Sequence, residues 1–203
     1  MDDNIEVELR VILNDSQEQS LVNTLTQNSA KYHGEEEITD VYFCKNTVEK
    51  FSQTAMNEVG SFSLRLREMT NDLGTQASMN VKIITKQGDH HAWEEHETDI
   101  SSLKEAAIIL KTLGFKIFFR LKKKRKVYKI AAMNMTVNIE NIDGFGTATE
   151  VEIITTQQKA EQAKQQIKDY LATAGISEDQ IVPKSITSIL MDKFSRFDNS
   201  LDL

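Results

Sequence analysis

The chain has 203 residues, of which 39% are hydrophobic and 27% are charged, enough to bury the core of one compact domain. Its formal net charge of −7 argues against a protein held on nucleic acid by bulk electrostatics, because such proteins normally carry an excess of Lys and Arg. Cys44, the only cysteine, offers no disulfide framework and no CxxC pair, which is typical of a reducing compartment and predicts a cytoplasmic protein.

The N-terminal residues MDDNIEVELR lack the basic and apolar regions of a signal peptide, and no apolar run approaches the length that spans a membrane. Pro183 is the only proline, and no Gly/Ser-rich linker or internal repeat divides the sequence. We therefore expect residues 1–203 to fold as a single domain without a membrane partner.

Stretches rich in β-branched and aromatic residues predict strands, in chain order, at residues 5–13, 40–44, 61–69, 80–86, 93–100, 115–121, 123–131, 135–142 and 147–155. Helices are expected from about Asp15, from Ser102 to residue 113, over residues 156–174 and over residues 188–194. The second helix has the clearest ends, with a capping-box pattern of Ser102 and Glu105 and with Gly114 at the C-cap position. The sequence therefore predicts a β-dominated, antiparallel α+β fold.

Charged side chains alternate with apolar ones along these strands. Residues two apart on a strand share a face, so Glu6, Glu8 and Arg10 lie opposite the face of Val7 and Leu9. The same alternation recurs on later strands, whose polar members are Arg65 and Arg67, Lys82 and Lys86, Lys123 and Arg125, Asn138 and Glu140, and Glu150 and Glu152. Carboxylates fill the first and last of these strands, and cations fill most of those between.

A solvated polar face is the ordinary outcome for antiparallel strands. Segregation of the charges by strand favours a barrel that closes with its charged face inward and its helices outside, because a merely soluble surface would mix the two signs. Grouped carboxylates select hard cations such as Mg²⁺ or Mn²⁺, and Arg and Lys can neutralise phosphate oxygens. A triphosphate is therefore the expected occupant of such a lumen.

The opening IEVELR resembles the E-x-E-x-[KR] signature of the CYTH family, also called triphosphate tunnel metalloenzymes. Further motifs follow in the family's order: Asp40 in DVYF, LRLRE at 64–68, Lys86 in TKQG, EEHE at 94–97, TLGF at 112–115, KKRKVY at 123–128, GFGTATEVEI at 144–153, and Pro183 to Ser185. Each motif is weak alone, but the ordered set covers nearly the whole chain.

The resemblance implies a closed eight-stranded antiparallel barrel around a triphosphate tunnel, with helices outside. It implies metal ligands for Mg²⁺ or Mn²⁺ at Glu6, Glu8, Glu140, Glu150 and Glu152. It implies phosphate-binding cations at Arg10, Arg65, Arg67, Lys86, Lys123, Arg125 and Lys184. Catalytic roles would belong to Glu6, Glu8, Arg10, Lys123 and Arg125. The chain is thus expected to be a metal-dependent enzyme that acts on a triphosphate, and the frequent homodimers of the family extend to it as an expectation.

Within the family, the strings LREM, TLGF and KKRKVY most resemble bacterial class IV adenylyl cyclases, which implies conversion of ATP to cyclic AMP and pyrophosphate. Inorganic and thiamine triphosphatases share the same tunnel residues, so hydrolysis of the terminal phosphate is the alternative. Three positions depart from the family pattern, with Trp93 in place of Arg, Ala148 in place of an aromatic residue and Ile186 in place of Tyr. Trp93 and Ala148 leave a non-catalytic nucleotide or polyphosphate binder as a further alternative.

Three other features have plainer explanations. The run KKKRK at residues 122–126 could form a nucleic-acid patch or belong to a structural barrel, but alternate members of a strand face outward and the chain is acidic overall. The spacing of His90, His91 and His96 fits no standard metal site. Gly144 and Gly146 are typical of a hairpin turn, since no helix follows them.

Overall fold

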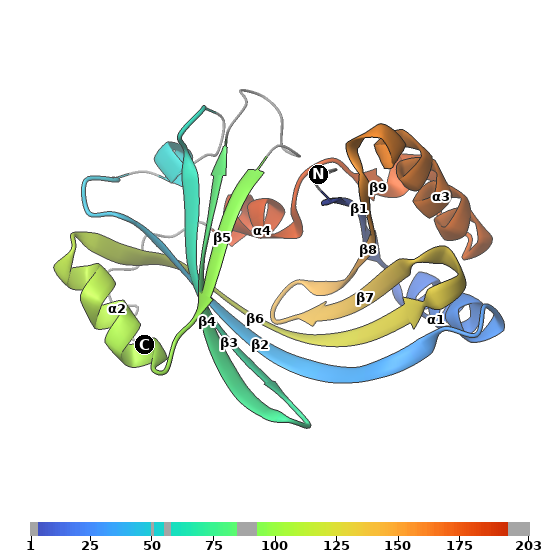
Figure 1. Ribbon diagram of the computed structural model, residues 1–203, viewed down its shortest axis with the longest axis horizontal. Coiled ribbons are helices and arrows are strands. Elements are labelled where there is room, and N and C mark those ends of the chain that lie inside the picture. The colour runs from blue at the N-terminus through green and yellow to red at the C-terminus, as the bar shows by residue number, and fades with distance from the viewer. Residues whose placement is uncertain (1–3, 50, 55–57, 85–92, 195–203) are drawn as a thin grey trace. The chain divides into compact units, whose positions relative to one another are not determined.

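The chain forms two compact units, drawn in Figure 1. The computed structural model describes residues 4–49, 51–54, 58–84 and 93–194. Unit 1 comprises Met1–Glu36 and Lys123–Ile189, and unit 2 comprises Glu37–Lys122 and Leu190–Leu203. Strands β2 (Lys31–Lys45) and β6 (Phe115–Ile130) run from one unit into the other. That residues 1–203 form a single domain stays a prediction.

The strands form an antiparallel sheet of nine strands in the hydrogen-bonded order β5-β4-β3-β2-β6-β7-β8-β1-β9. The other strands are β1 (Asn4–Leu13), β3 (Phe62–Asn71), β4 (Gly74–Ile84), β5 (Trp93–Asp99), β7 (Met135–Ile142), β8 (Gly146–Thr156) and β9 (Ile181–Val182). This confirms the predicted β-dominated antiparallel fold. Among the described residues the order ends at β5 and β9, a detail in which it departs from the expected closed barrel of eight strands.

In unit 1, alternate side chains of β1, β7 and β8 build an apolar face. Leu9 and Val11 of β1 lie on it, and helices α1 (Asp15–Gln27) and α3 (Ala160–Thr173) cover it. Leu21 of α1 and Ile167 and Leu171 of α3 are completely buried there. Burying a side chain of this size stabilises the fold by about 1.5–3 kcal/mol, so the packing of these helices decides which way each strand faces. The charged residues between them must therefore lie on the other face.

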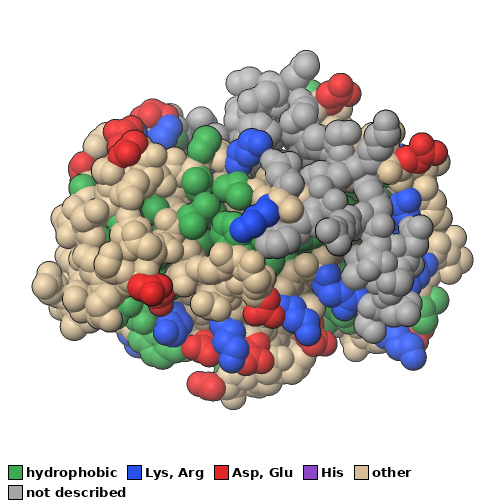
Figure 2. All heavy atoms as spheres, turned by 180° about the vertical axis from the view of Figure 1, so that it is seen from behind, with side chains coloured by type: hydrophobic (Ala, Val, Ile, Leu, Met, Phe, Trp, Pro, Cys, Tyr) green, Lys and Arg blue, Asp and Glu red, His purple; other side chains and the backbone are tan. Residues whose placement is uncertain are grey.

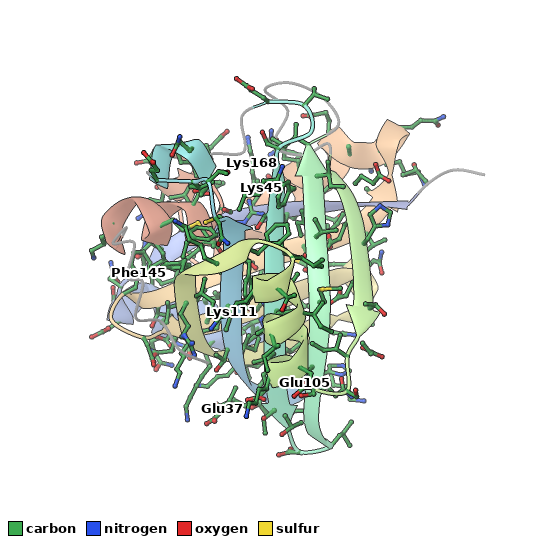
Figure 3. All side chains as sticks on the ribbon, turned by 90° about the vertical axis from the view of Figure 1, so that its left-hand side faces the viewer. Glu37, Lys45, Glu105, Lys111, Phe145 and Lys168 are labelled. Atoms are coloured by element: carbon green, nitrogen blue, oxygen red, sulfur yellow. The ribbon has the colours of Figure 1, made fainter. Side chains whose placement is uncertain are left out.

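In unit 2, helix α2 (Leu103–Thr112) covers the apolar face of β2, β3 and β4, where Val41, Phe43, Leu64, Leu66, Ala107 and Leu110 are buried together. The Ser102 hydroxyl accepts a hydrogen bond from the Glu105 N–H at 3.2 Å, which satisfies a free amide at the start of the helix. Gly114 follows the helix with φ at +87°, a conformation that favours glycine. Figure 3 shows α2 in front of the strands, with Glu105 and Lys111 among its side chains. Both predicted ends of this helix are confirmed.

Several predicted boundaries differ from the structure. Strand β6 is continuous, whereas the lysine run suggested two strands. Strand β2 begins at Lys31 rather than Asp40, because its first half is polar and mostly exposed and so lacks an apolar alternation. Strand β4 begins at Gly74 and pairs along its length with β3. Helix α3 begins at Ala160, after β8 has continued to Thr156, and the final helix α4 spans Ile186–Phe194.

The turn between β7 and β8 is a tight hairpin, as the sequence predicts. The Phe145 N–H donates to the Ile142 carbonyl at 3.0 Å, and Gly144 has φ at +71°. The turn fixes a register in which Glu140 lies opposite Ala148 and Asn138 lies opposite Glu150. Because a slip of one residue would reverse every side chain, this hairpin holds the acidic residues of both strands on one face.

Candidate functional site

The register of unit 1 gathers predicted site residues on the polar face of the sheet. Glu8 lies opposite Glu152, and Arg10 lies opposite Glu150, across the β1–β8 ladder. Directly opposed side chains have their Cβ atoms about 4.5–5.5 Å apart, which is within reach of an ion pair. Neighbouring strands β7 and β6 extend the same face. We call the whole set the unit 1 charged cluster; it consists of Glu6, Glu8, Arg10, Lys123, Arg125, Glu140, Glu150 and Glu152.

Arg10 links two carboxylates of this cluster. It forms an ion pair with Glu8 on its own strand, and its Nε donates to Glu150 Oε1 on β8 at 3.2 Å. All three side chains are largely buried, with 14% exposure for Arg10, 22% for Glu8 and 19% for Glu150. Arg10 therefore neutralises part of the acidic charge along β1 and β8.

Glu140 lies at the cationic end of the cluster and is almost completely buried, with 1% exposure. Its Oε1 accepts from Lys123 Nζ at 2.5 Å and from Arg125 Nε at 2.8 Å. Burial alone would raise the pKa of this carboxyl, but the charges of Lys123 and Arg125 and their hydrogen bonds hold the pKa below its ordinary value. Glu140 is therefore ionised near neutral pH and holds two cations in fixed positions. Arg125 also lies 3.8 Å from Glu36 of β2, measured from Nη1 to Oε2.

Glu152 lies at the acidic end, where negative charges meet. Its burial and then the neighbouring charge of Glu6 raise the pKa of this carboxyl, and Glu150 adds to the effect. A hydrogen bond with Thr136 and the charge of Arg125 oppose this shift only in part. The acidic end therefore has more negative charge than its protein neighbours compensate.

The donor set of the cluster fits a divalent cation. Glu6, Glu8, Glu140, Glu150 and Glu152 supply carboxylate oxygens, which Mg²⁺ and Mn²⁺ prefer. Five carboxylates against three cations leave two negative charges in excess when all are ionised. Within the part of the chain that the structure describes, however, no three His, Cys, Asp or Glu side chains converge into a ready-made metal site. The metal roles of these glutamates stay predictions.

Unit 2 has a charged cluster of its own on the polar face of β2 and β3. We call it the unit 2 charged cluster; it consists of Asp40, Arg65 and Arg67. Asp40 lies directly opposite Arg67 in the β2–β3 ladder, and Arg65 is two residues away on the same face. Arg67 donates from Nε to Asp40 Oδ1 at 2.7 Å and from Nη2 to Oδ2 at 2.8 Å. Two predicted phosphate-binding arginines therefore share one buried carboxylate.

The same face continues onto β4 and β5. Glu95 Oε2 lies 3.0 Å from Lys82 Nζ, and Glu95 Oε1 accepts from Asn80 Nδ2 at 2.5 Å. Burial would raise the pKa of Glu95, but Lys82 and Asn80 lower it, with a further contribution from the charge of Arg65. Lys82, which strand parity placed on the charged face, is thus a partner of the EEHE motif.

The structure gives less information on three other positions that the sequence analysis named. Lys86 lies outside the described residues, so its phosphate role stays a prediction. Lys184 is exposed and follows β9, whose Val182 is paired with Arg10. The backbone of Trp93 belongs to β5 opposite Ile84.

Sequence reasoning gave no role to two buried polar residues of unit 2. Asp40 has 1% exposure and Asn80 has 2%, and both bond to charged residues of the polar face. A signal for Asp40 was present, because it is a lone carboxylate beside the apolar run VYFC. A charged residue within a buried strand requires a partner, which strand parity alone does not identify.

The lysine run of β6 divides between the two faces of the strand. Lys123 is buried and Arg125 half-buried on the polar face, whereas Lys122, Lys124 and Lys126 are exposed on the other. Figure 2 shows Lys and Arg side chains interspersed with Asp and Glu along the lower edge of the face it presents. That mixed pattern is typical of a solvated surface rather than of a field of one sign.

A pocket of about 420 Å³ lies on the helical side of unit 1. Its wall is formed mainly by α3, from Gln162 to Thr173, together with Asn28 and Met133. None of the predicted site residues lines it. The pocket therefore plays no part in the charged clusters.

No helix in the described part of the chain combines the length and the apolar character needed to cross a membrane. A comparison with curated proteins finds no match.

Comparison with solved structures gives close matches in fold. PH1819 from Pyrococcus horikoshii OT3 is similar with a TM-score of 0.73 at 21% identity, covering 93% of this chain and 99% of its own. A candidate adenylate cyclase from Vibrio parahaemolyticus has a TM-score of 0.72 at 21% identity, covering 92% and 97%. HpAC1 from Hippeastrum, a candidate adenylyl cyclase described as having a dominant triphosphatase activity, has a TM-score of 0.67 at 17% identity, covering 94% and 96%. At these identities the likeness establishes the fold.

The family match is more specific than the likeness to individual structures. The CYTH domain matches residues 4–186, which begin in β1 and end at the start of α4. The matched segment includes every described residue of both charged clusters. This chain belongs to the CYTH domain family.

Proposed function

We propose that this protein is a divalent-metal-dependent enzyme that acts on a triphosphate. The observation that carries the proposal is the unit 1 charged cluster, in which Glu8 and Glu152 face each other beside the Arg10–Glu150 pair. Phosphoryl transfer is catalysed mainly by positioning and by stabilisation of charge, which such a cluster can supply. Family membership supports the proposal, because CYTH proteins process triphosphates.

The proposed residue roles are those that the family resemblance implies, and the chemistry of each side chain suits its role. The predicted metal ligands are Glu6, Glu8, Glu140, Glu150 and Glu152, and a bound Mg²⁺ or Mn²⁺ would stabilise negative charge on phosphate oxygens. The predicted phosphate-binding residues are Arg10, Arg65, Arg67, Lys86, Lys123, Arg125 and Lys184. Arg and Lys donate charge-assisted hydrogen bonds to phosphate, and Arg can do so from two nitrogens at once.

Binding of a metal ion and a triphosphate would change the ion-pair partners of several Arg and Lys side chains. Arg10 pairs with Glu8 and Glu150, and Lys123 pairs with Glu140. If these carboxylates turn to a cation, Arg10 loses its countercharges and becomes free to donate to phosphate oxygens. Metal and triphosphate would then bind more tightly together than either does alone, which is expected of a coupled pair of sites.

The reaction proposed first is that of an adenylyl cyclase. The 3′-hydroxyl of ATP attacks the α-phosphorus and loses its proton as the bond from that phosphorus to the bridging oxygen breaks. Pyrophosphate leaves with that proton, and cyclic AMP is the other product. The LREM, TLGF and KKRKVY strings support this choice. Lys123 and Arg125, held by Glu140, would stabilise charge on the phosphate chain as the bond breaks.

Hydrolysis of the terminal phosphate is the second candidate. The observation that favours it is the fold likeness to HpAC1, described as having a dominant triphosphatase activity. Water would then attack the γ-phosphorus, the bond from that phosphorus to the bridging oxygen would break, and orthophosphate would leave, with the same carboxylates and cations in use. For either reaction we propose a cytoplasmic location. Cys44 is the only cysteine in the sequence, and it is a free thiol whose pKa is raised by burial. A single free cysteine is typical of a reducing compartment.

The test is to incubate the purified protein with ATP, tripolyphosphate or thiamine triphosphate, with Mg²⁺, with Mn²⁺ or with neither, and to separate the products. Cyclic AMP with pyrophosphate would support the cyclase, and release of orthophosphate would support the triphosphatase. Binding of a triphosphate without any product under every metal condition would indicate a non-catalytic binder. Absence of both binding and product would overturn the proposal.

A further inference from the structure

Asp40 is the centre of the unit 2 charged cluster, although nothing in its sequence motif assigns it a task. It lies on β2, directly before the buried residues 41–44, and has 1% exposure. Both of its carboxylate oxygens accept from Arg67, at 2.7 Å from Nε and 2.8 Å from Nη2. Two parallel bonds of this kind fix the plane of a guanidinium as well as its position.

Arg65 approaches the same carboxylate without bonding to it. Its Nε lies 3.7 Å from Asp40 Oδ1, which is too long for a hydrogen bond, and this buried donor has no hydrogen-bond partner. The side chains of Arg65 and Arg67 are only 15% and 17% exposed. One buried anion therefore stands between two largely buried cations, and one donor remains unsatisfied.

This arrangement is poorly suited to a purely structural ion pair. A buried pair contributes to stability when charges balance and donors are satisfied, and apolar residues often serve as well. Here Asp40 has less charge than the two arginines beside it, the charge of Arg65 also acts on Glu95 of β5, and the buried Arg65 Nε has no hydrogen-bond partner. A buried polar group without a partner calls for an explanation, such as a ligand that completes the site.

We propose that Asp40 is a positioning residue, which fixes the Arg67 guanidinium by its bidentate bonds and holds Arg65 beside it by charge, so that both arginines meet phosphate oxygens preorganised. This inference rests on the proposed function, since it gives Asp40 a task only if a triphosphate binds. A guanidinium that is already oriented loses less conformational entropy when it binds phosphate. Asp40 itself does not touch the substrate.

The decisive variant is Asp40→Asn, because the charge and the positioning explanations predict opposite signs. Loss of a negative charge beside two arginines would by itself attract polyphosphate more strongly. Loss of positioning would weaken tripolyphosphate binding and lower kcat/KM for the best triphosphate roughly 10- to 100-fold, as for other supporting residues. We expect weaker binding, measured by calorimetry, together with the lower kcat/KM. Tighter binding with unchanged kcat would overturn the inference.

A second variant guards against a folding defect. Asp40→Glu keeps the charge but moves the carboxylate by one methylene, so it should also lower kcat/KM if geometry matters. The matched control is Glu178→Gln, which removes an exposed carboxylate that pairs with Lys168. Far-UV circular dichroism and Tm of each variant separate folding from function. Normal kcat/KM in Asp40→Glu, or a lower Tm as the only defect of Asp40→Asn, would assign Asp40 a structural role.

A double-mutant cycle tests whether Asp40 acts through Arg67. If it does, Asp40→Asn combined with Arg67→Lys should lose little more kcat/KM than Arg67→Lys alone. Additive losses would contradict positioning. Failure of the wild-type protein to bind or convert any triphosphate would overturn the proposed function and this inference together, whereas an active wild type with an unaffected Asp40→Asn would overturn only the inference.

Discussion

At the scale of single residues, the carboxylates of β1 give the most direct test of the proposed chemistry. Changing Glu8 to Gln keeps its size but removes the charge that faces Glu152 and pairs with Arg10. We expect turnover to fall at least roughly 100- to 1,000-fold, the size of effect that follows loss of one well-placed charge partner. Glu6→Gln should behave alike, because its charge acts on the same carboxyl, Glu152.

The control for both variants is Glu161→Gln, which alters an exposed carboxylate in the first turn of α3. Product formation is measured with saturating Mg²⁺ or Mn²⁺, and Tm shows whether the fold persists. A Glu8→Gln protein with the turnover of the wild type would remove that residue from the site.

For Glu140 we predict an effect on the free energy of unfolding rather than on catalysis. Changing it to Gln removes the carboxylate charge that both Lys123, at 8% exposure, and Arg125 contact, and breaking a buried pair in this way costs about 3–5 kcal/mol. Urea unfolding at neutral pH should show that loss. Unchanged unfolding free energy would mean that the two cations find other partners.

The lowered pKa of Glu140 also predicts that the free energy of unfolding depends on pH. The pKa of Glu140 is lower in the folded protein than its ordinary value of 4.5, so the folded state favours the ionised form. Its stabilisation is therefore fully present above pH 4.5 and is lost as the pH falls through the folded pKa. Between neutral pH and acid, the unfolding free energy of Glu140→Gln should change less than that of the wild type. Parallel pH profiles would contradict the depressed pKa.

At the scale of elements, a comparison of strand β6 with strands β1, β7 and β8 shows what the sequence can predict. Alternation along β1, β7 and β8 is regular, so strand parity identified which of their side chains share a face, and the register confirms it. The charged run of β6 was correctly divided between two faces, but its continuity was missed, because five consecutive cations resemble a loop. Pairing with neighbouring strands, together with the ion pairs of Lys123 and Arg125 with Glu140, compensates for the cost of bringing these charges together.

The parity of β6 leads to a matched pair of variants. Lys123 is buried against Glu140, whereas the preceding residue Lys122 is exposed. Lys123→Gln should lower kcat/KM strongly, and Lys122→Gln should leave it unchanged, although both changes remove the same charge. Kinetics with ATP or tripolyphosphate at two ionic strengths measure both. Equal losses would indicate that only the overall charge of the strand matters.

The sequence predicted which residues lie on the charged faces, but it did not predict which of those residues bond to each other. The motifs identified Arg67 and Glu140 as charged-face residues without showing that one is bound by Asp40 and the other by Lys123. These contacts depend on how neighbouring strands are registered, and hydrophobic periodicity along one strand carries no such information. Residues 31–39 were missed as strand for a related reason, since pairing rather than apolar alternation holds them in the sheet.

At the scale of the whole molecule, the excess of acidic charge leads to a prediction about stability. Binding of a triphosphate with a divalent cation should be measurable as a rise in Tm. The chain carries a net charge of −7, and its unit 1 charged cluster has more carboxylates than cations, so a triphosphate should bind poorly until a divalent cation offsets the repulsion. A ligand at 100 times its dissociation constant stabilises the folded state by about 2.7 kcal/mol. We expect tripolyphosphate with Mg²⁺ or Mn²⁺ to raise Tm by several degrees, and expect a chelator to abolish most of the increase. Sodium sulfate at the same ionic strength controls for general salt effects. An equal increase without any divalent cation would show that the lysines and arginines hold the phosphate chain alone, and that the acidic residues have another purpose.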